Sequence, residues 1–229
     1  MINTVDCPWP WPQLPFADPP WELHCDILTV WFRTDVDALR PYLHHDLLPL
    51  GHSALARARF YTIVARTPQG DLPFKELTLG VRDPAGRAGT EIAFAMWTDS
   101  WKYLCWGREH FGWPLTYAEI NIPDAFYRTS GLTASIPDAG ISAQLQAVGP
   151  RVEVSAPASW VTPRRRLLTT GPSEEMLLVR PEVISSGTTH QVEVSVNLGE
   201  WFPQPTWGDS LVTYGAMLRV GRDVLIEQR

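Results

Sequence analysis

Residues 107–120, GREHFGWPLTYAEI, bring together side chains that can carry or stabilise charge. The five that do so are Arg108, Glu109, His110, Tyr117 and Glu119. Carboxylates, imidazoles and phenols serve as general acids and bases, and an arginine can stabilise an anion that forms during a reaction. The segment therefore predicts acid–base chemistry, and the surrounding elements decide which of these side chains meet.

Two interpretations stand for each group in the first half of this segment. His110 could act as a general base because histidine titrates near neutrality, or it could be an ordinary surface or core residue. Arg108 and Glu109 could line a pocket, or they could form an internal ion pair that braces the fold. If both lie on a strand, only one of the two reaches the pocket, because neighbours on a strand face opposite ways.

The second half of the segment depends on whether residues 116–120 form a strand. In that case Tyr117 and Glu119 share one face, and Thr116 and Ala118 take the other. The shared face could aim a hydroxyl and a carboxylate at one ligand. Ordinary amphipathic alternation explains the same pattern equally well.

Glu76 is a further candidate, because it lies in the apolar strand-like run FKELTL. Alternation would place it on the same face as Phe74, with Lys75 on the opposite face. Burial would raise the pKa of Glu76 toward neutrality and suit it to proton transfer. The alternative is a glutamate on an edge strand that faces water.

Lysine occurs only at 75 and 102 among 19 basic residues, so few amines are available for chemistry.

The elements that position these groups are mainly strands. Runs rich in β-branched and aromatic residues recur between turn signals, which is typical of an antiparallel barrel or sandwich. The runs are LHCDILTVWF, ARARFYTIVAR, FKELTLGVR, TEIAFAMW, KYLCWG, TYAEINI, ISAQLQAV, RVEVSA, HQVEVSVNL and VTYGAMLRV. We therefore expect a mainly β fold in one domain over residues 22–229. Residues 1–21 should form an extended arm rich in proline and tryptophan.

One or two short helices interrupt this pattern. VDALRPYL, residues 36–43, has apolar residues at helical spacing and a cap at Thr34 or Asp35. PSEEMLLV, residues 172–179, could form a second helix capped by Ser173.

Three segments in register resemble the acetoacetate decarboxylase superfamily. They are Phe32–Arg40 with its D-x-x-A-L turn, Phe74–Leu77, which is similar to the family's Tyr-x-Glu strand, and Asp99 followed by Gly107–Glu109. In the last segment the family typically reads G-R-E-x-x-G-[FY]-P-K-K. The resemblance covers about residues 22–120 and extends more loosely to the C-terminus. It implies a cone-shaped antiparallel β-barrel with a largely apolar central pocket, usually oligomeric.

The same resemblance shows where this chain departs from the family. In family decarboxylases the first lysine after the proline forms a Schiff base, and the second lowers the pKa of the first. The matching residues are Leu115 and Thr116, and neither can form an imine. The family's substrate-carboxylate arginine corresponds to Cys25, which cannot clamp a carboxylate. Glu76 occupies the family's catalytic-glutamate position.

The leading hypothesis is an enzyme of secondary metabolism that works without an imine on a polyketide-like or β-dicarbonyl substrate. It would be a cyclase, dehydratase or isomerase in which Glu76 moves a proton and Arg108 or Tyr117 stabilises an enolate. Holding a reactive conformer could instead supply most of the catalysis. The alternatives are a decarboxylase or lyase that uses Lys102 as its amine, and a non-catalytic binder of a hydrophobic metabolite.

Eleven tryptophans in this length could wall a pocket for a large apolar substrate, although core filling and subunit contacts explain many of them. The catalytic candidates are thus Glu76, Arg108 and Tyr117. The substrate-binding candidates are Cys25, Glu109, His110, Trp113, Leu115, Thr116 and Glu119.

Composition excludes several classes of function. A net charge of -6 and a pI of about 5.5 argue against a nucleic-acid partner. Three cysteines without a C-x-x-C spacing favour reduced thiols over a disulfide framework or a zinc site. Without a leader or a long apolar run, we expect a soluble cytoplasmic homo-oligomer that makes no membrane contact. We also expect no cofactor and no metal, because the adjacent pair His44–His45 with Asp46 rarely forms a site alone.

Overall fold

The first long strand shows how the sheet bends. β1 (Trp21–Asp35) buries every second side chain as far as Ile27, and the phase of burial then shifts at Leu28. The register between β1 and β12 (Thr206–Val220) shifts at the same place, between Cys25 and Ile27. An irregularity of this kind bends a strand and increases its twist. β1 therefore buries one face along its first half and the opposite face along its second half.

The computed structural model describes residues 20–43, 48–49, 51–82, 91–111, 113–153, 160–163, 175–179, 182–202, 205–220 and 224–228. Besides β1 and β12, the strands are β2 (Ser53–Thr67), β3 (Gly70–Arg82), β4 (Glu91–Thr98), β5 (Leu115–Tyr117), β6 (Thr133–Ile136), β7 (Ile141–Val152), β8 (Trp160–Pro163), β9 (Glu175–Val179), β10 (Glu182–Ser185), β11 (Thr188–Asn197) and β13 (Val224–Gln228). The helices are α1 (Trp101–Phe111) and the short 3-10 segments η1 (Val36–Leu39), η3 (Phe126–Arg128), η4 (Pro137–Ala139) and η5 (Gly199–Trp201).

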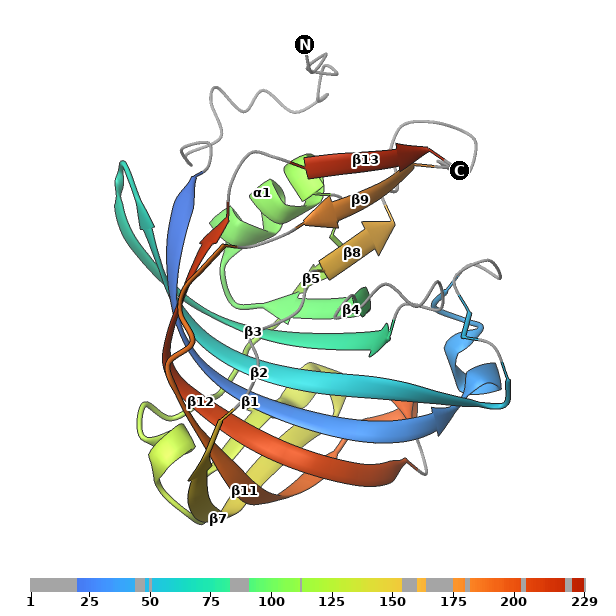
Figure 1. Cartoon of the computed structure of the whole chain (residues 1–229), viewed down its shortest axis with the longest axis vertical. Helices are drawn as coiled ribbons and strands as arrows, with labels where there is room; N and C mark the ends of the chain where they lie inside the picture. The colour runs from blue at the N-terminus through green and yellow to red at the C-terminus, as the bar shows by residue number, and fades with distance from the viewer. Residues whose placement is uncertain are drawn as a thin grey trace.

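Within these residues the strands form a single curled sheet. Its order is β13-β9-β8-β4-β3-β2-β1-β12-β11-β7-β6, with β10 beside β12 and β5 beside β4. Figure 1 shows the long strands β1, β2, β3 and β12 curving round so that β7 and β11 lie below them and α1 lies above. Neighbouring strands are antiparallel except that β4 runs parallel to β5 and β8. The expected antiparallel barrel is thus confirmed as a curled, mostly antiparallel half-barrel.

The curled sheet separates two apolar cores. The large core lies between the second halves of β1 and β3, the first halves of β2 and β12, and strands β6, β7 and β11. It contains Phe60, Leu77 and Trp97. The helix-side core lies between α1 and the opposite face of the same strands, and it contains Tyr61 and Met96. Adjacent residues of one strand thus enter different cores, as alternation requires.

The helix α1 begins at a cap that is also tied to β3. The Ser100 hydroxyl accepts a hydrogen bond from the Tyr103 backbone N–H at 3.2 Å, which satisfies one free donor of the first turn. The preceding Asp99 carboxylate accepts from the Lys75 backbone N–H at 2.7 Å. This link holds the start of α1 against β3, beside Glu76.

Three expectations about secondary structure need correction or trimming. The run KYLCWG, expected as a strand, lies in α1, where Tyr103, Leu104 and Trp106 bury one helical face. MLLV, expected in a second helix, lies in β9, which pairs with both β8 and β13. The helix expected over 36–43 is a single turn, η1, capped by the Asp35 carboxylate through the Asp37 N–H at 2.8 Å.

Some expectations lie on residues outside the described part of the chain. These are most of the arm, residues 1–19, the second proposed cap Ser173, and the His44–His45 pair with Asp46. Trp21, expected at the end of the arm, is the buried first residue of β1. No helix among the described residues has the length and apolar character to cross a bilayer.

The packing of α1 gives a prediction about Gly107. An alanine in place of a helical glycine usually stabilises a protein by about 0.5–1 kcal/mol. Here a Cβ would overlap the Leu115 Cδ1 and lie 2.9 Å from Trp113 Cε3. Overpacking typically costs about 1–3 kcal/mol, so we expect Gly107→Ala to lower the free energy of unfolding by about 1–2 kcal/mol.

Urea denaturation measures this change. Lys102→Ala, on the exposed side of the same helix, is the control and should leave the free energy of unfolding almost unchanged. If Gly107→Ala stabilised the protein as an ordinary helical substitution does, the close packing of α1 on Leu115 would be wrong.

Candidate active site

Two neighbouring strands carry a polar stripe into the helix-side core. β2 and β3 pair antiparallel, with Tyr61 opposite Glu76 and Arg59 opposite Thr78. Directly opposed residues project from the same face of a sheet, so these four side chains are neighbours. All four are buried, and Arg59 donates to the Tyr61 hydroxyl at 3.4 Å. A carboxyl, a phenol and a guanidinium are therefore gathered away from water.

A buried ion cluster continues the stripe. The Glu91 carboxylate forms ion pairs with Arg57 and with Arg59, the latter at 2.7 Å, through the same oxygen Oε2. Glu91 reaches both arginines because Gly80 of β3, which lies opposite Arg57 of β2, has no side chain to block the contact. A Cβ on Gly80 would overlap the Glu91 carboxylate. Burial lowers the pKa of Arg59, but Glu91, Tyr61 and Glu76 together outweigh burial and leave that pKa raised.

Glu76 and Glu91 are the buried carboxyls of the described residues, and Glu76 lacks the two ion pairs that Glu91 has. Its Oε1 accepts a hydrogen bond from Thr78 at 2.6 Å. Its Oε2 is buried and has no partner of hydrogen-bonding geometry in the described part of the chain. Burial raises the pKa of Glu76, and the hydroxyls of Thr78 and Tyr103 and the charge of Arg59 oppose that rise without cancelling it. Glu76 is thus able to hold a proton at a higher pH than an exposed glutamate.

Cys25 and Leu115 lie in the same helix-side core as Tyr61 and Tyr103. Burial, followed by the negative charge of Glu76, raises the pKa of the Cys25 thiol, so the thiol is neutral. The charge of Glu76 acts on the Cys25 thiol, so Cys25 of β1 and Glu76 of β3 lie near each other. Trp113 is buried in this core as well.

Leu115 is fully buried at the start of β5, beside Met96 of β4. Its side chain packs against Gly107 of α1, where the missing Cβ leaves room for it. The position that the sequence resemblance assigns to the imine-forming lysine is therefore filled by a hydrocarbon. Both lysines lie elsewhere: Lys102 is exposed on α1, and Lys75 donates to the Ile120 carbonyl at 3.4 Å.

The structure places several candidates away from Glu76. Arg108 is exposed on α1, because the segment is a helix and strand alternation does not apply. Tyr117 is 42 % exposed and stacks on Trp101 with ring centroids 4.4 Å apart. Thr116 is also exposed, and Glu119 is exposed and accepts from the Asn121 amide at 3.2 Å.

The expectation of a strand over 116–120 is therefore wrong. β5 ends at Tyr117, so Tyr117 and Glu119 do not share a ligand-facing strand. The side chains of Glu109 and His110 lie outside the described part of the structure.

Sequence reasoning missed the groups that do surround Glu76. These are Arg59 and Tyr61 from β2 and Tyr103 from α1. A usable signal was present in β2, where arginines alternate with apolar residues inside the run ARARFY. Charges at every second position of an otherwise buried strand predict a polar stripe on one face. No such signal pointed to Tyr103, because the run KYLCWG that contains it resembles a strand although it lies in a helix.

Comparison with known proteins agrees with this architecture. A family model described as acetoacetate decarboxylase matches residues 4–144. Similar structures include the enduracididine biosynthesis enzyme MppR complexed with the condensation product of pyruvate and imidazole 4-carboxaldehyde, at 15% identity and a TM-score of 0.63 over 92% of this chain and 90% of that one. Among curated proteins, a sequence search finds no match.

Two further structures have the same fold. An acetoacetate decarboxylase-like enzyme from Sphingomonas wittichii RW1 has 17% identity and a TM-score of 0.68, over 94% of this chain and 95% of that one. Acetoacetate decarboxylase from Legionella pneumophila has 13% identity and a TM-score of 0.60, over 94% and 92%. At these identities the likeness establishes the fold alone.

The raised pKa of Glu76 predicts how stability depends on pH. The folded protein keeps the Glu76 proton to a higher pH than the unfolded chain, whose glutamates titrate near about 4.3. The resulting stabilisation is complete below that value and is lost as pH rises through the folded pKa. Glu76→Gln keeps the shape but cannot ionise, so its free energy of unfolding should not show this loss.

Urea denaturation of both proteins from acid to neutral pH tests the prediction. The stability of Glu76→Gln relative to wild type should rise with pH, by up to about 1.4 kcal/mol per pH unit inside the window. Glu193→Gln, an exposed substitution on β11, should track wild type. A difference between Glu76→Gln and wild type that stays constant with pH would show that burial does not shift the pKa of Glu76.

Proposed function

Because this chain belongs to the acetoacetate decarboxylase family, a family of enzymes, we propose that it moves protons on a carbonyl substrate without forming a Schiff base. One observation carries the proposal. A buried glutamate with a raised pKa lies opposite Tyr61, which shares the helix-side core with Leu115, where the family's amine would be. Proton transfer is the family chemistry that needs a carboxyl and no amine.

The reaction class follows from the groups around Glu76. As a carboxylate, Glu76 takes a proton from the carbon next to a carbonyl, and the C–H electron pair moves onto the carbonyl oxygen as an enolate. Arg59 and the Tyr61 hydroxyl lie on the same face and stabilise that oxygen. They take the role that the sequence had suggested for Arg108 and Tyr117.

The proton that Glu76 holds then has three possible destinations. Its return to another carbon completes an isomerisation. Its transfer to a departing β-hydroxyl releases water and completes a dehydration. If the enolate carbon attacks a second carbonyl of the same molecule, transfer to the new alkoxide completes a cyclisation. Each route returns Glu76 to its starting form, so no cofactor has to supply electrons.

The surroundings of Glu76 favour an apolar substrate of polyketide type. The helix-side core contributes aromatic and aliphatic side chains, including Tyr103, Trp113 and Leu115, and Cys25 offers no clamp for a small keto acid. MppR, complexed with the condensation product of pyruvate and imidazole 4-carboxaldehyde, supports the idea that this fold accommodates carbonyl compounds other than acetoacetate.

The other hypotheses have less support. Lys102 is exposed on α1, so a lyase that uses its amine gains nothing from the geometry. Substrate templating and non-catalytic binding both remain possible outcomes of experiment, because each would leave Glu76 without a chemical role.

Deuterium exchange into 2-tetralone, an apolar ketone that enolises, tests proton transfer directly. Proton NMR in D2O should show faster loss of the α-proton signal with wild type than with buffer alone. Removing a general base typically costs about 10²–10⁴-fold, so Glu76→Gln should lose at least about 10²-fold of this rate. The exposed Glu193→Gln should keep it.

Exchange that is as fast in Glu76→Gln as in wild type would favour templating. A wild type that binds 2-tetralone and does not accelerate exchange would favour a binding protein. Either result contradicts the proposal.

Borohydride trapping tests the absence of an imine. With pyruvate and sodium borohydride, we expect mass spectrometry to find no adduct on wild type, because neither lysine lies in the helix-side core. Leu115→Lys places an amine there, and burial should keep part of it neutral and nucleophilic. That variant should acquire one adduct at position 115, and Leu115→Met should acquire none. An adduct on the wild-type protein would show that imine chemistry is still available.

A further inference from the structure

A hollow lies on the other side of the sheet from Glu76. It has a volume of about 490 Å³ and is lined by residues from the end of β4, β5, η4 and η5. Trp97 lines this hollow and belongs to the large core. It pairs with Leu77 of β3, whereas the next residue of β4, Thr98, pairs with Glu76. Successive residues of a strand face opposite sides. This hollow, the tryptophan cleft, is therefore separate from the candidate active site.

Two glycine turns build the base of the tryptophan cleft. Gly140 and Gly199 both have positive φ values, 64° and 61°, which glycine adopts at little cost. The turns meet closely, because a Cβ on Gly199 would lie 3.1 Å from the carbonyl oxygens of Ala139 and Gly140. η4 and η5 are thereby held side by side, and their side chains rise around one space.

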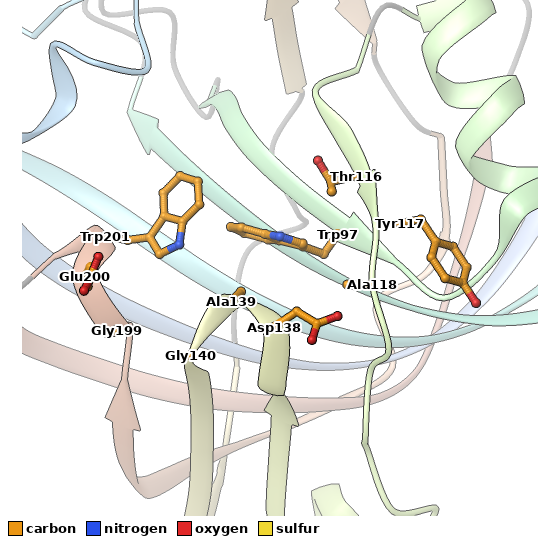
Figure 2. A pocket seen from close by; sticks show the side chains of 10 residues that line it. All are labelled: Trp97, Thr116, Tyr117, Ala118, Asp138, Ala139, Gly140, Gly199, Glu200 and Trp201. Atoms are coloured by element: carbon orange, nitrogen blue, oxygen red, sulfur yellow. The ribbon is translucent and has the colours of Figure 1, made fainter.

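The walls of the cleft are two indoles. Trp97 and Trp201 meet edge to face, with ring centroids 5.0 Å apart at 89°. Trp201 also stacks on Tyr42 at 4.7 Å, which fixes its orientation. Trp97 is only 6 % exposed. Figure 2 shows the Trp97 ring reaching into the space beside Trp201 and above Asp138.

The charged side chains that line the tryptophan cleft are all negative. Its lining includes the carboxylates of Asp138 and Glu200 and no lysine, arginine or histidine. Figure 2 shows these carboxylates on two sides of the cleft. Both residues are exposed, and neither belongs to an ion pair in the described part of the structure. The space beside the two indoles is therefore aromatic and negatively charged.

We propose that the tryptophan cleft binds a small organic cation, an ammonium or guanidinium group attached to an apolar or planar body. Aromatic faces attract cations through their quadrupole, and tryptophan does so most strongly. The carboxylates add attraction and disfavour anions. The volume lies within the range of about 300–1,000 Å³ that suits one small molecule. The proposal is independent of the proton transfer assigned to Glu76.

A cation, a neutral compound of the same shape and an aromatic anion test the preference for charge. Benzyltrimethylammonium is the cation, neopentylbenzene its neutral isostere and benzoate the anion, and each is titrated into the full-length protein while tryptophan fluorescence and ligand NMR are recorded. The cation should bind, benzoate should not, and the neutral compound should bind more weakly. Because the carboxylates are exposed, added salt should weaken the cation's binding.

Variants locate the binding. Asp138→Asn combined with Glu200→Gln changes only exposed groups and should weaken the cation about three- to tenfold. Trp201→Leu should weaken it about fivefold or more. Asp124→Asn, an exposed carboxylate outside the cleft, is the matched control and should have no effect. Circular dichroism and thermal denaturation verify that each variant is folded.

Several outcomes would overturn the proposal. They are binding of benzoate as tight as that of the cation, unchanged binding in the Asp138/Glu200 double variant, or no binding of the cation at all. If Trp201→Leu instead changed the oligomeric state in analytical ultracentrifugation and the cation did not bind, the cleft would be a contact between copies of the chain. Because Glu76 lies across the sheet, Glu76→Gln should leave binding of the cation intact.

Discussion

The removal of Glu76 from water is the constraint on which the candidate site depends. α1 covers this face of the sheet, and its start is tied to β3 through Asp99 and the Lys75 N–H. A carboxyl held there loses hydration, which disfavours its charged form. The two nearby guanidinium groups share Glu91, and the charge of Arg59 only partly offsets the effect of burial on Glu76. A proton on Glu76 is therefore stabilised by the packing of the fold itself.

Leu115 strengthens that constraint. A lysine at this position would bring a cation close to Glu76 and favour the charged carboxylate. The leucine fills the same place with hydrocarbon and packs on Gly107, which excludes water from the core. By the sequence resemblance, Leu115 stands where the family carries its nucleophile, and it also changes the environment of Glu76. In the proposed function the chain keeps groups for proton transfer and lacks a buried amine for imine formation.

The sequence predicted the strands well where apolar and polar residues alternate, as in β1, β2 and β3, because alternation reflects burial directly. It failed at residues 102–107, where aromatic residues in a capped helix resemble a strand. Cys25, Glu76 and Leu115 could be grouped from family register. Arg59 and Tyr61 could not, because their contact with Glu76 depends on cross-strand register between β2 and β3. Arg108 and Tyr117 were misplaced for a different reason. Strand alternation was applied to residues that lie in a helix and in a three-residue strand.

Infrared difference spectroscopy of the Glu76 carboxyl measures the central claim most directly. A protonated carboxylic acid and a carboxylate have separate C=O bands, and subtraction of the Glu76→Gln spectrum isolates this one group. The structure predicts a protonated band that persists to a higher pH than that at which exposed glutamates ionise. A Glu76 band that converts to carboxylate together with the exposed glutamates would contradict the account.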